Sequence, residues 1–152
     1  MAAIGIKRTN HTAFTVSDLD RAAAFFRDVL GFSITEKTRQ KGEVVGRITG
    51  VPGAELDIAF AVAPGHMIEL MQYITPVSGR SLDLRPCDPG FSHIAFEVDD
   101  IDAAVAAIEA AGYTAVSRPQ VVPAGPRKGG KNVYTRGPDG IVIEFQEAPP
   151  AR

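Results

Sequence analysis

The stretch that decides the fold is His11-Thr12-Ala13-Phe14-Thr15-Val16-Ser17-Asp18-Leu19-Asp20, because the chain repeats it 82 residues later as His93-Ile94-Ala95-Phe96-Glu97-Val98-Asp99-Asp100-Ile101-Asp102. Six of the ten positions are identical, and the leading histidine is one of them. A second motif also recurs, because Ile68-Glu69-Leu70 in the first half is matched by Ile143-Glu144-Phe145 in the second. The chain is therefore predicted to consist of two similar modules, each with one histidine early and one glutamate late.

Alternation of apolar and polar residues, followed by an aspartate, predicts a strand and then a capped helix in each half. In the first half we expect a strand over 10–17, a helix over 19–30, and strands over 32–38, 42–48, 55–63 and 66–73. In the second half we expect a strand over 92–98, a helix from Asp99 or Asp100 to Ala111, and strands over 113–117, 133–136 and 141–147. The segment 118–131 holds three prolines and three glycines, which indicates a loop.

The predicted fold class is α+β, with a first βαβββ module over residues 5–75, a linker over 76–90 and a second βαβββ module over 91–148. Neither module can bury a sheet face alone, so we expect the two to pair into one domain, an eight-stranded open barrel or cup with its helices outside. Because side chains alternate along a strand, His11, Glu69, His93 and Glu144 are expected on the face that lines this cup.

Composition narrows the function classes. Lys and Arg number 16 and Asp and Glu 18, so the net charge is −2, which argues against nucleic-acid binding. No apolar run approaches the length of a membrane-spanning helix. Cys87 is the only cysteine, and the opening Met1-Ala2-Ala3-Ile4-Gly5 has no signal-peptide pattern, so a cytoplasmic protein is expected.

The four repeated residues predict a metal site. Glu69 and Glu144 each lie in an apolar strand, where an unpaired carboxylate is costly to bury. One divalent cation removes that cost, and two imidazoles with two carboxylates nearly balance its charge. Such a mixed nitrogen and oxygen set suits Ni, Zn, Co, Mn or Fe(II). His66 is outside the repeat and is interpreted as a surface turn residue.

These motifs resemble the vicinal oxygen chelate superfamily, which includes glyoxalase I, methylmalonyl-CoA epimerase, fosfomycin resistance proteins and extradiol dioxygenases. The openings NHTAFTVSDLDRAAAFFRDVLGF and FSHIAFEVDDIDAAVAAIEAAGY are similar to the two openings of that fold, and HMIELMQY and PDGIVIEFQ to its two ligand-bearing strands. The resemblance implies that His11, Glu69, His93 and Glu144 are the metal ligands. Their order, and GPRKGGKNVYTRGPDGIVIEF, resembles bacterial glyoxalase I. HIAFEVDDID is equally similar to methylmalonyl-CoA epimerase, which usually has Gln where this chain has Glu69.

The resemblance implies a divalent-metal-dependent lyase or isomerase/epimerase that chelates a small carbonyl substrate through vicinal oxygens. It would move a proton next to the carbonyl through an enolate held by the metal. Glu144 is the first candidate for the catalytic base, and Glu69 is the candidate on the opposite face. One base gives isomerisation, whereas two give epimerisation. Small proteins of this superfamily are commonly dimers, so a homodimer is expected, with the cup completed either within one chain or across the two chains.

The candidate substrate-contact residues each have two interpretations. Met67, Met71, Tyr73 and Tyr134 either line an apolar pocket or fill the core, and Arg127 and Lys128 in a glycine-rich loop either bind a carboxylate or phosphate or are simply solvated. Two alternative functions are an Fe(II) extradiol-type dioxygenase and a non-catalytic small-molecule binding or resistance protein. A fourth ligand at Glu69 argues against the first, and the complete ligand set argues against the second.

Overall fold

The computed structural model describes residues 4–80 and 83–151, and the chain divides into two compact units, residues 1–78 and 79–152. The division falls within the predicted linker 76–90. Residues 81 and 82 of that linker, residues 1–3 of the opening segment and residue 152 lie outside the described part of the chain. The union of the two units into one domain stays a prediction.

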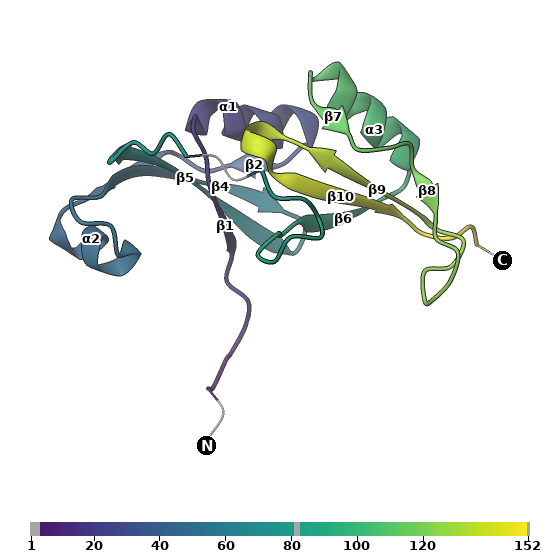
Figure 1. Cartoon of the computed structure of the whole chain (residues 1–152), viewed down its shortest axis with the longest axis horizontal. Coiled ribbons are helices and arrows are strands. Elements are labelled where there is room, and N and C mark those ends of the chain that lie inside the picture. The colour runs from purple at the N-terminus through teal and green to yellow at the C-terminus, as the bar shows by residue number, and fades with distance from the viewer. Residues whose placement is uncertain (1–3, 81–82, 152) are drawn as a thin grey trace. The chain divides into compact units, whose positions relative to one another are not determined.

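The first unit is a mixed sheet with one covering helix (Figure 1). Its strands lie in the order β1-β5-β4-β2, with β3 also paired to β4, and β1 runs parallel to β5. The helical segment α1 continues directly into a π-helical turn, η1, and contacts β4 and β5. The elements are β1 (Thr12–Thr15), α1 (Leu19–Ala24), η1 (Phe25–Val29), β2 (Ser33–Ile34), β3 (Thr38–Lys41), α2 (Glu43–Thr49), β4 (Glu55–Ala63) and β5 (His66–Thr75).

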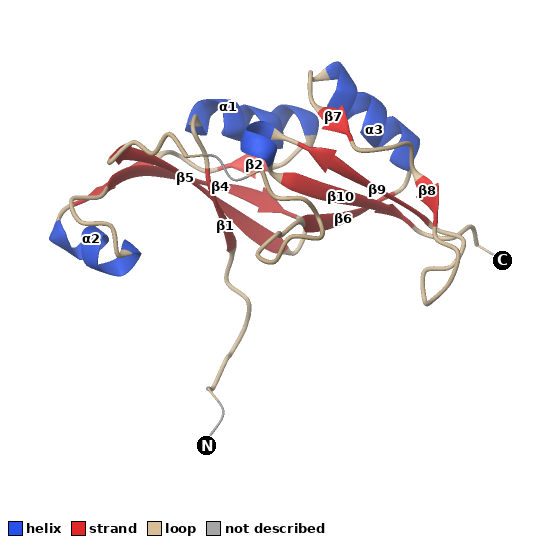
Figure 2. Cartoon of the chain, viewed as in Figure 1, coloured by secondary structure: helices blue, strands red, loops and turns tan. Residues whose placement is uncertain are grey.

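The second unit repeats this arrangement with fewer residues (Figure 2). Its strands lie in the order β6-β10-β9-β7, with β8 also paired to β9, and β6 runs parallel to β10. The helix α3 contacts β9 and β10. The elements are β6 (Ile94–Val98), α3 (Ile101–Ala110), β7 (Thr114–Ala115), β8 (Gln120–Val121), β9 (Lys131–Arg136), the short 3₁₀ turn η2 (Pro138–Gly140) and β10 (Val142–Glu147).

The two sheets have the same topology. β2 and β3 pair with successive parts of β4, and β7 and β8 pair with successive parts of β9, so each pair forms one interrupted edge strand. Each unit is thus a βαβββ module, and the predicted α+β class with two such modules is confirmed. Closure of the sheets into a barrel stays a prediction.

The repeated aspartates begin the helices in both units. Asp18 accepts a hydrogen bond from the Arg21 amide, and Asp100 accepts one from the Ala103 amide. A side chain from the last strand of each module reaches the same helix end, because Gln72 accepts from the Leu19 amide and Glu147 accepts from the Ile101 amide. These contacts satisfy helix N–H groups that have no partner within the helix.

The core lies between each helix and one face of its sheet. Fully buried residues there include Leu19, Phe26, Ile68, Leu70, Ile101, Ile108 and Ile143. Because strand side chains alternate, burial of Ile68 and Leu70 beneath the helix turns Glu69 to the opposite face of the sheet. The same alternation turns Glu144 away from Ile143 and Phe145.

The expectation of a strand over 42–48 is wrong, because these residues lie almost entirely in the helix α2 (Glu43–Thr49). Two glycines with positive φ set its limits, Gly42 at 98° and Gly50 at 70°. Glu43 and Arg47 form an ion pair of 2.9 Å one helical turn apart. The valines favoured a strand, but helix-terminating glycines and a helical ion pair decide the local structure. The segment 118–131 also differs from a pure loop, because it contains β8.

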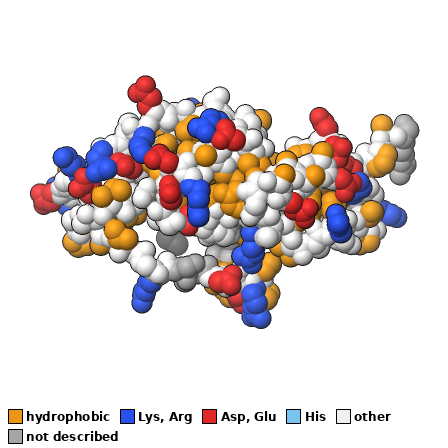
Figure 3. Space-filling view, turned by 90° about the horizontal axis from the view of Figure 1, so that it is seen from above, with side chains coloured by type: hydrophobic (Ala, Val, Ile, Leu, Met, Phe, Trp, Pro, Cys, Tyr) orange, Lys and Arg blue, Asp and Glu red, His pale blue; other side chains and the backbone are white. Residues whose placement is uncertain are grey.

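Two features bear on membrane insertion and on nucleic-acid binding. No helix among residues 4–80 and 83–151 is long and apolar enough to cross a membrane. On the face seen in Figure 3, Lys and Arg side chains are interspersed with Asp and Glu side chains, so neither sign of charge dominates that face.

Candidate metal centre

The first unit brings His11 and Glu69 together. His11 directly precedes β1, and Ala13 of β1 is paired with Glu69 of β5. The His11 Nε2 atom lies 3.3 Å from Glu69 Oε2. The other ring nitrogen, Nδ1, is 2.7 Å from the side-chain oxygen of Asn10. When Nδ1–H donates to Asn10, Nε2 carries the lone pair and lies on the side of Glu69. Histidine ligands of metals usually have their other ring nitrogen held by a partner in this way.

The second unit builds the same pair from the repeated residues. His93 directly precedes β6, and Ala95 of β6 is paired with Glu144 of β10. The His93 Nε2 atom lies 3.1 Å from Glu144 Oε2. Glu144 is one of few buried charged residues, at 8% exposure. In both units, therefore, the glutamate is paired with the residue two positions after the histidine, on the parallel neighbouring strand.

An aromatic ring flanks each pair, but the two rings differ. Phe60 of β4 is paired with Glu69, and its ring lies edge-on to His11 at 6.0 Å between centroids. Tyr134 of β9 is paired with Glu144, and its ring centroid is 5.0 Å from that of His93. Burial, and secondarily the negative charge of Glu144, raises the pKa of the Tyr134 hydroxyl, which therefore stays protonated and able to donate a hydrogen bond.

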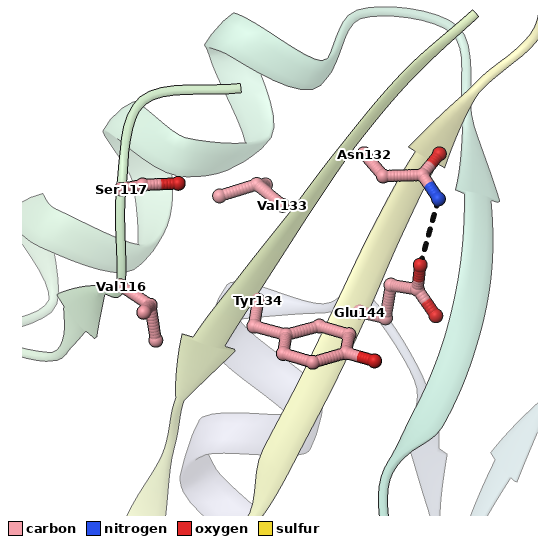
Figure 4. A pocket seen from close by; sticks show the side chains of 6 residues that line it. All are labelled: Val116, Ser117, Asn132, Val133, Tyr134 and Glu144. Atoms are coloured by element: carbon pink, nitrogen blue, oxygen red, sulfur yellow. Dashed lines mark hydrogen bonds between the residues drawn. The ribbon is translucent and has the colours of Figure 1, made fainter. Parts of the chain in front are cut away.

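Asn132 also reaches the second pair, although the sequence reasoning did not identify it. Its Nδ2–H donates to Glu144 Oε1 at 2.8 Å, as Figure 4 shows. Its Oδ1 atom is buried and has no hydrogen-bond partner. In the first unit the corresponding position is Ile58, because Ile58 pairs with Met71 as Asn132 pairs with Gln146. Aligning the two modules strand by strand would have revealed this polar residue.

A pocket of about 230 Å³ opens beside this pair within the second unit (Figure 4). Its lining combines a carboxylate, an amide and two hydroxyl-bearing side chains with apolar surface. The lining residues are Val116, Ser117, Asn132, Val133, Tyr134 and Glu144.

The other predicted substrate residues lie in three settings. Met67, Met71 and Tyr73 are separated from Glu69 by an even number of residues along β5 and therefore share its sheet face, with Met67 exposed and the others half-buried. Arg127 Nη1 donates to Glu97 at 2.9 Å, while its Nε and Nη2 atoms are buried without a partner. Lys128 is exposed. The structure thus places Tyr134 at the pocket and ties Arg127 to β6.

The geometry of each pair fits a divalent cation. Two ligands about 2.1 Å from one cation lie about 3.0–3.4 Å apart for ligand angles between octahedral and tetrahedral. The observed nitrogen-to-oxygen separations of 3.3 Å and 3.1 Å match this spacing. Within the part of the chain that the structure describes, no three His, Cys, Asp or Glu side chains gather as a metal site. Each unit thus offers two ligands.

Curated relatives of the chain include enzymes of two kinds, an epimerase and a lyase. The chain is 33% identical over 150 residues to a 2-epi-5-epi-valiolone epimerase from Actinomyces. This match covers 95% of this chain and 81% of that protein. It is 30% identical over 145 residues to a lactoylglutathione lyase from Haemophilus influenzae, with 90% of each chain covered. Lyases and epimerases are therefore both found at about this level of identity.

A solved structure and a family model agree with these relatives. The crystal structure of a glyoxalase family protein from Bacillus cereus superposes with a TM-score of 0.84 at 29% identity and covers 99% of both chains. Residues 8–145 match the model of the Glyoxalase/Bleomycin resistance protein/Dioxygenase superfamily. The chain therefore belongs to this superfamily, the vicinal oxygen chelate proteins that its repeated motifs resemble.

Proposed function

We propose that the chain is a divalent-cation-dependent enzyme that moves a proton on the carbon next to a carbonyl group, as an epimerase or a glyoxalase-type lyase. The observation that supports this most is the repeated histidine–glutamate pair, at 3.3 Å in one unit and 3.1 Å in the other. Each pair has the spacing of two ligands on one cation, and both are built from the same strand register.

Both pairs are needed for one site in this proposal. Two ligands from a single unit hold a cation weakly, whereas His11, Glu69, His93 and Glu144 together give four. Two neutral imidazoles and two carboxylates balance a charge of +2, and this set suits Ni, Zn, Co, Mn or Fe(II). A six-coordinate cation held by these four residues would have room for two neighbouring oxygens of a substrate.

The chain's own residues bind and orient the substrate and move its proton. A bound cation supplies the positive charge that stabilises the oxyanion formed when the proton leaves. Glu144 or Glu69 accepts that proton at a carboxylate oxygen and returns it. The Tyr134 hydroxyl donates a hydrogen bond to a substrate oxygen, and Met67, Met71 and Tyr73 contact its apolar part. Lys128, with Arg127, is the proposed contact for an anionic substituent.

The relatives support a substrate with an oxygen-bearing carbon beside its carbonyl group. The name of the epimerase relative refers to 2-epi-5-epi-valiolone, and the name of the lyase relative refers to lactoylglutathione. The pocket next to Glu144 offers Ser117, Asn132 and Tyr134 as hydrogen-bonding side chains. This lining favours a small, hydroxyl-rich carbonyl compound.

Cation binding and proton exchange test the proposal together. Purified protein is loaded with Ni²⁺, Zn²⁺, Co²⁺ or Mn²⁺, and bound metal is measured by elemental analysis. A panel of hydroxyketones, acyl-CoA esters and the glutathione adduct of methylglyoxal is then incubated in D₂O. We expect one cation per chain and deuterium at the carbon next to the carbonyl.

Variants define the controls. His11→Ala should lose the cation. His66→Ala should retain it, because His66 forms a hydrogen bond with Thr12 and is outside both histidine–glutamate pairs. Replacing the proton-accepting glutamate by glutamine should lower turnover by about 10²–10⁴-fold. Oxygen uptake with a catechol on Fe(II), or tight ligand binding with no exchange, would instead support a dioxygenase or a binding protein.

A further inference from the structure

The two glutamates of the proposed site have different surroundings. Glu144 Oε1 accepts a hydrogen bond of 2.8 Å from Asn132, and its other oxygen, Oε2, lies 3.1 Å from His93. Glu69 also has Oε2 beside a histidine, but its cross-strand neighbour is Phe60, and Ile58 stands where the second unit has Asn132. Neither of these side chains carries an N–H group.

The orientation of the Asn132 amide follows from its partner. An ionised carboxylate only accepts hydrogen bonds, so the NH₂ end of the amide must face Glu144. The opposite end, Oδ1, is then buried without a partner, which costs stability. An apolar residue such as Ile58 would avoid this cost. A buried polar atom without a hydrogen-bond partner needs an explanation, and a role in the site beside it is one.

We propose that Asn132 is a positioning residue that makes Glu144 the fixed carboxylate ligand of the cation and leaves Glu69 the adaptable one. With Oε1 held by the amide, Glu144 would offer a cation only its Oε2 atom. Glu69 has no such restraint from Ile58 or Phe60 and would be the carboxylate free to take the substrate proton. This inference rests on the proposed function, because it assigns separate roles within that site.

Cation affinity tests the inference without a substrate. Zn²⁺ and Ni²⁺ affinities are measured against a chromophoric chelator for wild type, Asn132→Leu and the matched control Ile58→Leu. Outer partners of metal ligands typically change affinity by about 10–100-fold when they are removed, so this weakening is expected for Asn132→Leu. Ile58→Leu should bind as wild type does. Asn132→Val is a second variant suited to a strand, and thermal unfolding checks that both variants fold.

A double-mutant cycle links the effect to Glu144. Asn132→Leu should weaken binding little further when Glu144→Gln is present, but by its full factor when Glu69→Gln is present. Glu144→Gln alone should lose more affinity than Glu69→Gln. In the metal-free protein, the side-chain amide NMR signals of Asn132 should move in Glu144→Gln and stay in place in Glu69→Gln.

Two failures are distinguishable. If wild type binds a cation and the folded Asn132 variants bind it as tightly, the inference is overturned while the proposed function stands. The inference is also overturned if Asn132→Leu has the same effect on the Glu144→Gln and Glu69→Gln backgrounds. If wild type binds no divalent cation, the proposed function is wrong and the inference falls with it.

Discussion

Gly130 shows how closely the backbone is packed at the end of β10. A Cβ atom at this buried position would lie 2.5 Å from the carbonyl oxygen of Glu147 on β10 and 3.2 Å from that of Arg127. Backbone atoms cannot yield as a flexible side chain does, so Gly130→Ala should lower the free energy of unfolding by about 1–3 kcal/mol. Urea denaturation measures this change.

Gly79 provides the control for that substitution. A Cβ atom there meets no heavy atom within 4 Å, so Gly79→Ala should leave the denaturation midpoint nearly unchanged. Equal midpoints for the two alanine variants would show that β10 shifts freely near Glu147. Because Glu144 is on the same strand, such freedom would also weaken the argument that its carboxylate is held in place.

Single residues also show what the sequence could reveal about the site. The repeat singled out His11, Glu69, His93 and Glu144 because identical spacing along two similar modules places them at equivalent points of two sheets. Asn132 was missed because it is outside both repeated motifs, and its role depends on which residue it faces across the strands. The approach of its amide to Glu144 is a fact of strand register.

At the level of elements, an ion pair fastens the edge strand β3 to β4. Arg39 and Asp57 are direct cross-strand partners, and Arg39 Nη2 donates to Asp57 Oδ2 at 3.0 Å while Nε donates to Oδ1. These hydrogen bonds hold the pKa of the Asp57 carboxyl below its ordinary value despite its burial. The charged form is therefore stabilised by folding.

The sign of the pH effect follows from that lowered pKa. The contribution of Asp57 is present in full above the unfolded-state pKa of about 3.9, and it is lost as the pH falls through the lower folded-state pKa. Asp57→Asn should lower the free energy of unfolding at pH 7 by about 1–3 kcal/mol and reduce its loss in acid. Urea denaturation from pH 7 down to acid measures both effects.

Asp28 is the matched control for Asp57. It also pairs with an arginine, Arg27, and the pKa of its carboxyl is also lowered, but both side chains are more than half exposed. Solvent screens such a pair, so Asp28→Asn should change stability little at any pH. A larger loss in Asp28→Asn than in Asp57→Asn would contradict the assigned role of the β3–β4 pair.

The misprediction of the helix α2 has a physical cause. The helix α2 has β-branched residues at Val44, Val45 and Ile48, which favour a strand locally. Its limits depend on positive φ angles at Gly42 and Gly50, and the sequence alone does not show which glycines adopt a positive φ. The helical segment formed by α1 with η1, and the helix α3, were predicted well because each has an aspartate cap and a continuous apolar stripe. Periodicity thus decides long elements, whereas short ones depend on backbone geometry.

At the scale of the whole molecule, the proposed site requires one cation to be held by both units. A ligand that binds only the folded state stabilises it, by about 2.7 kcal/mol when present at 100 times its Kd. If two ligands come from each unit, that stabilisation must reach both sheets. Hydrogen exchange followed by mass spectrometry should therefore show slower exchange in β5 and in β10 together when Zn²⁺ or Ni²⁺ is added.

Substitutions separate a shared site from a local one. His93→Ala removes a ligand from the second unit only, yet it should abolish the cation-dependent protection of β5 in the first unit as well. His66→Ala should retain the protection in both, because His66 contacts Thr12 and neither glutamate pair. If His93→Ala leaves β5 fully protected by the cation, the first unit binds metal by itself, and a single centre built from both modules is excluded.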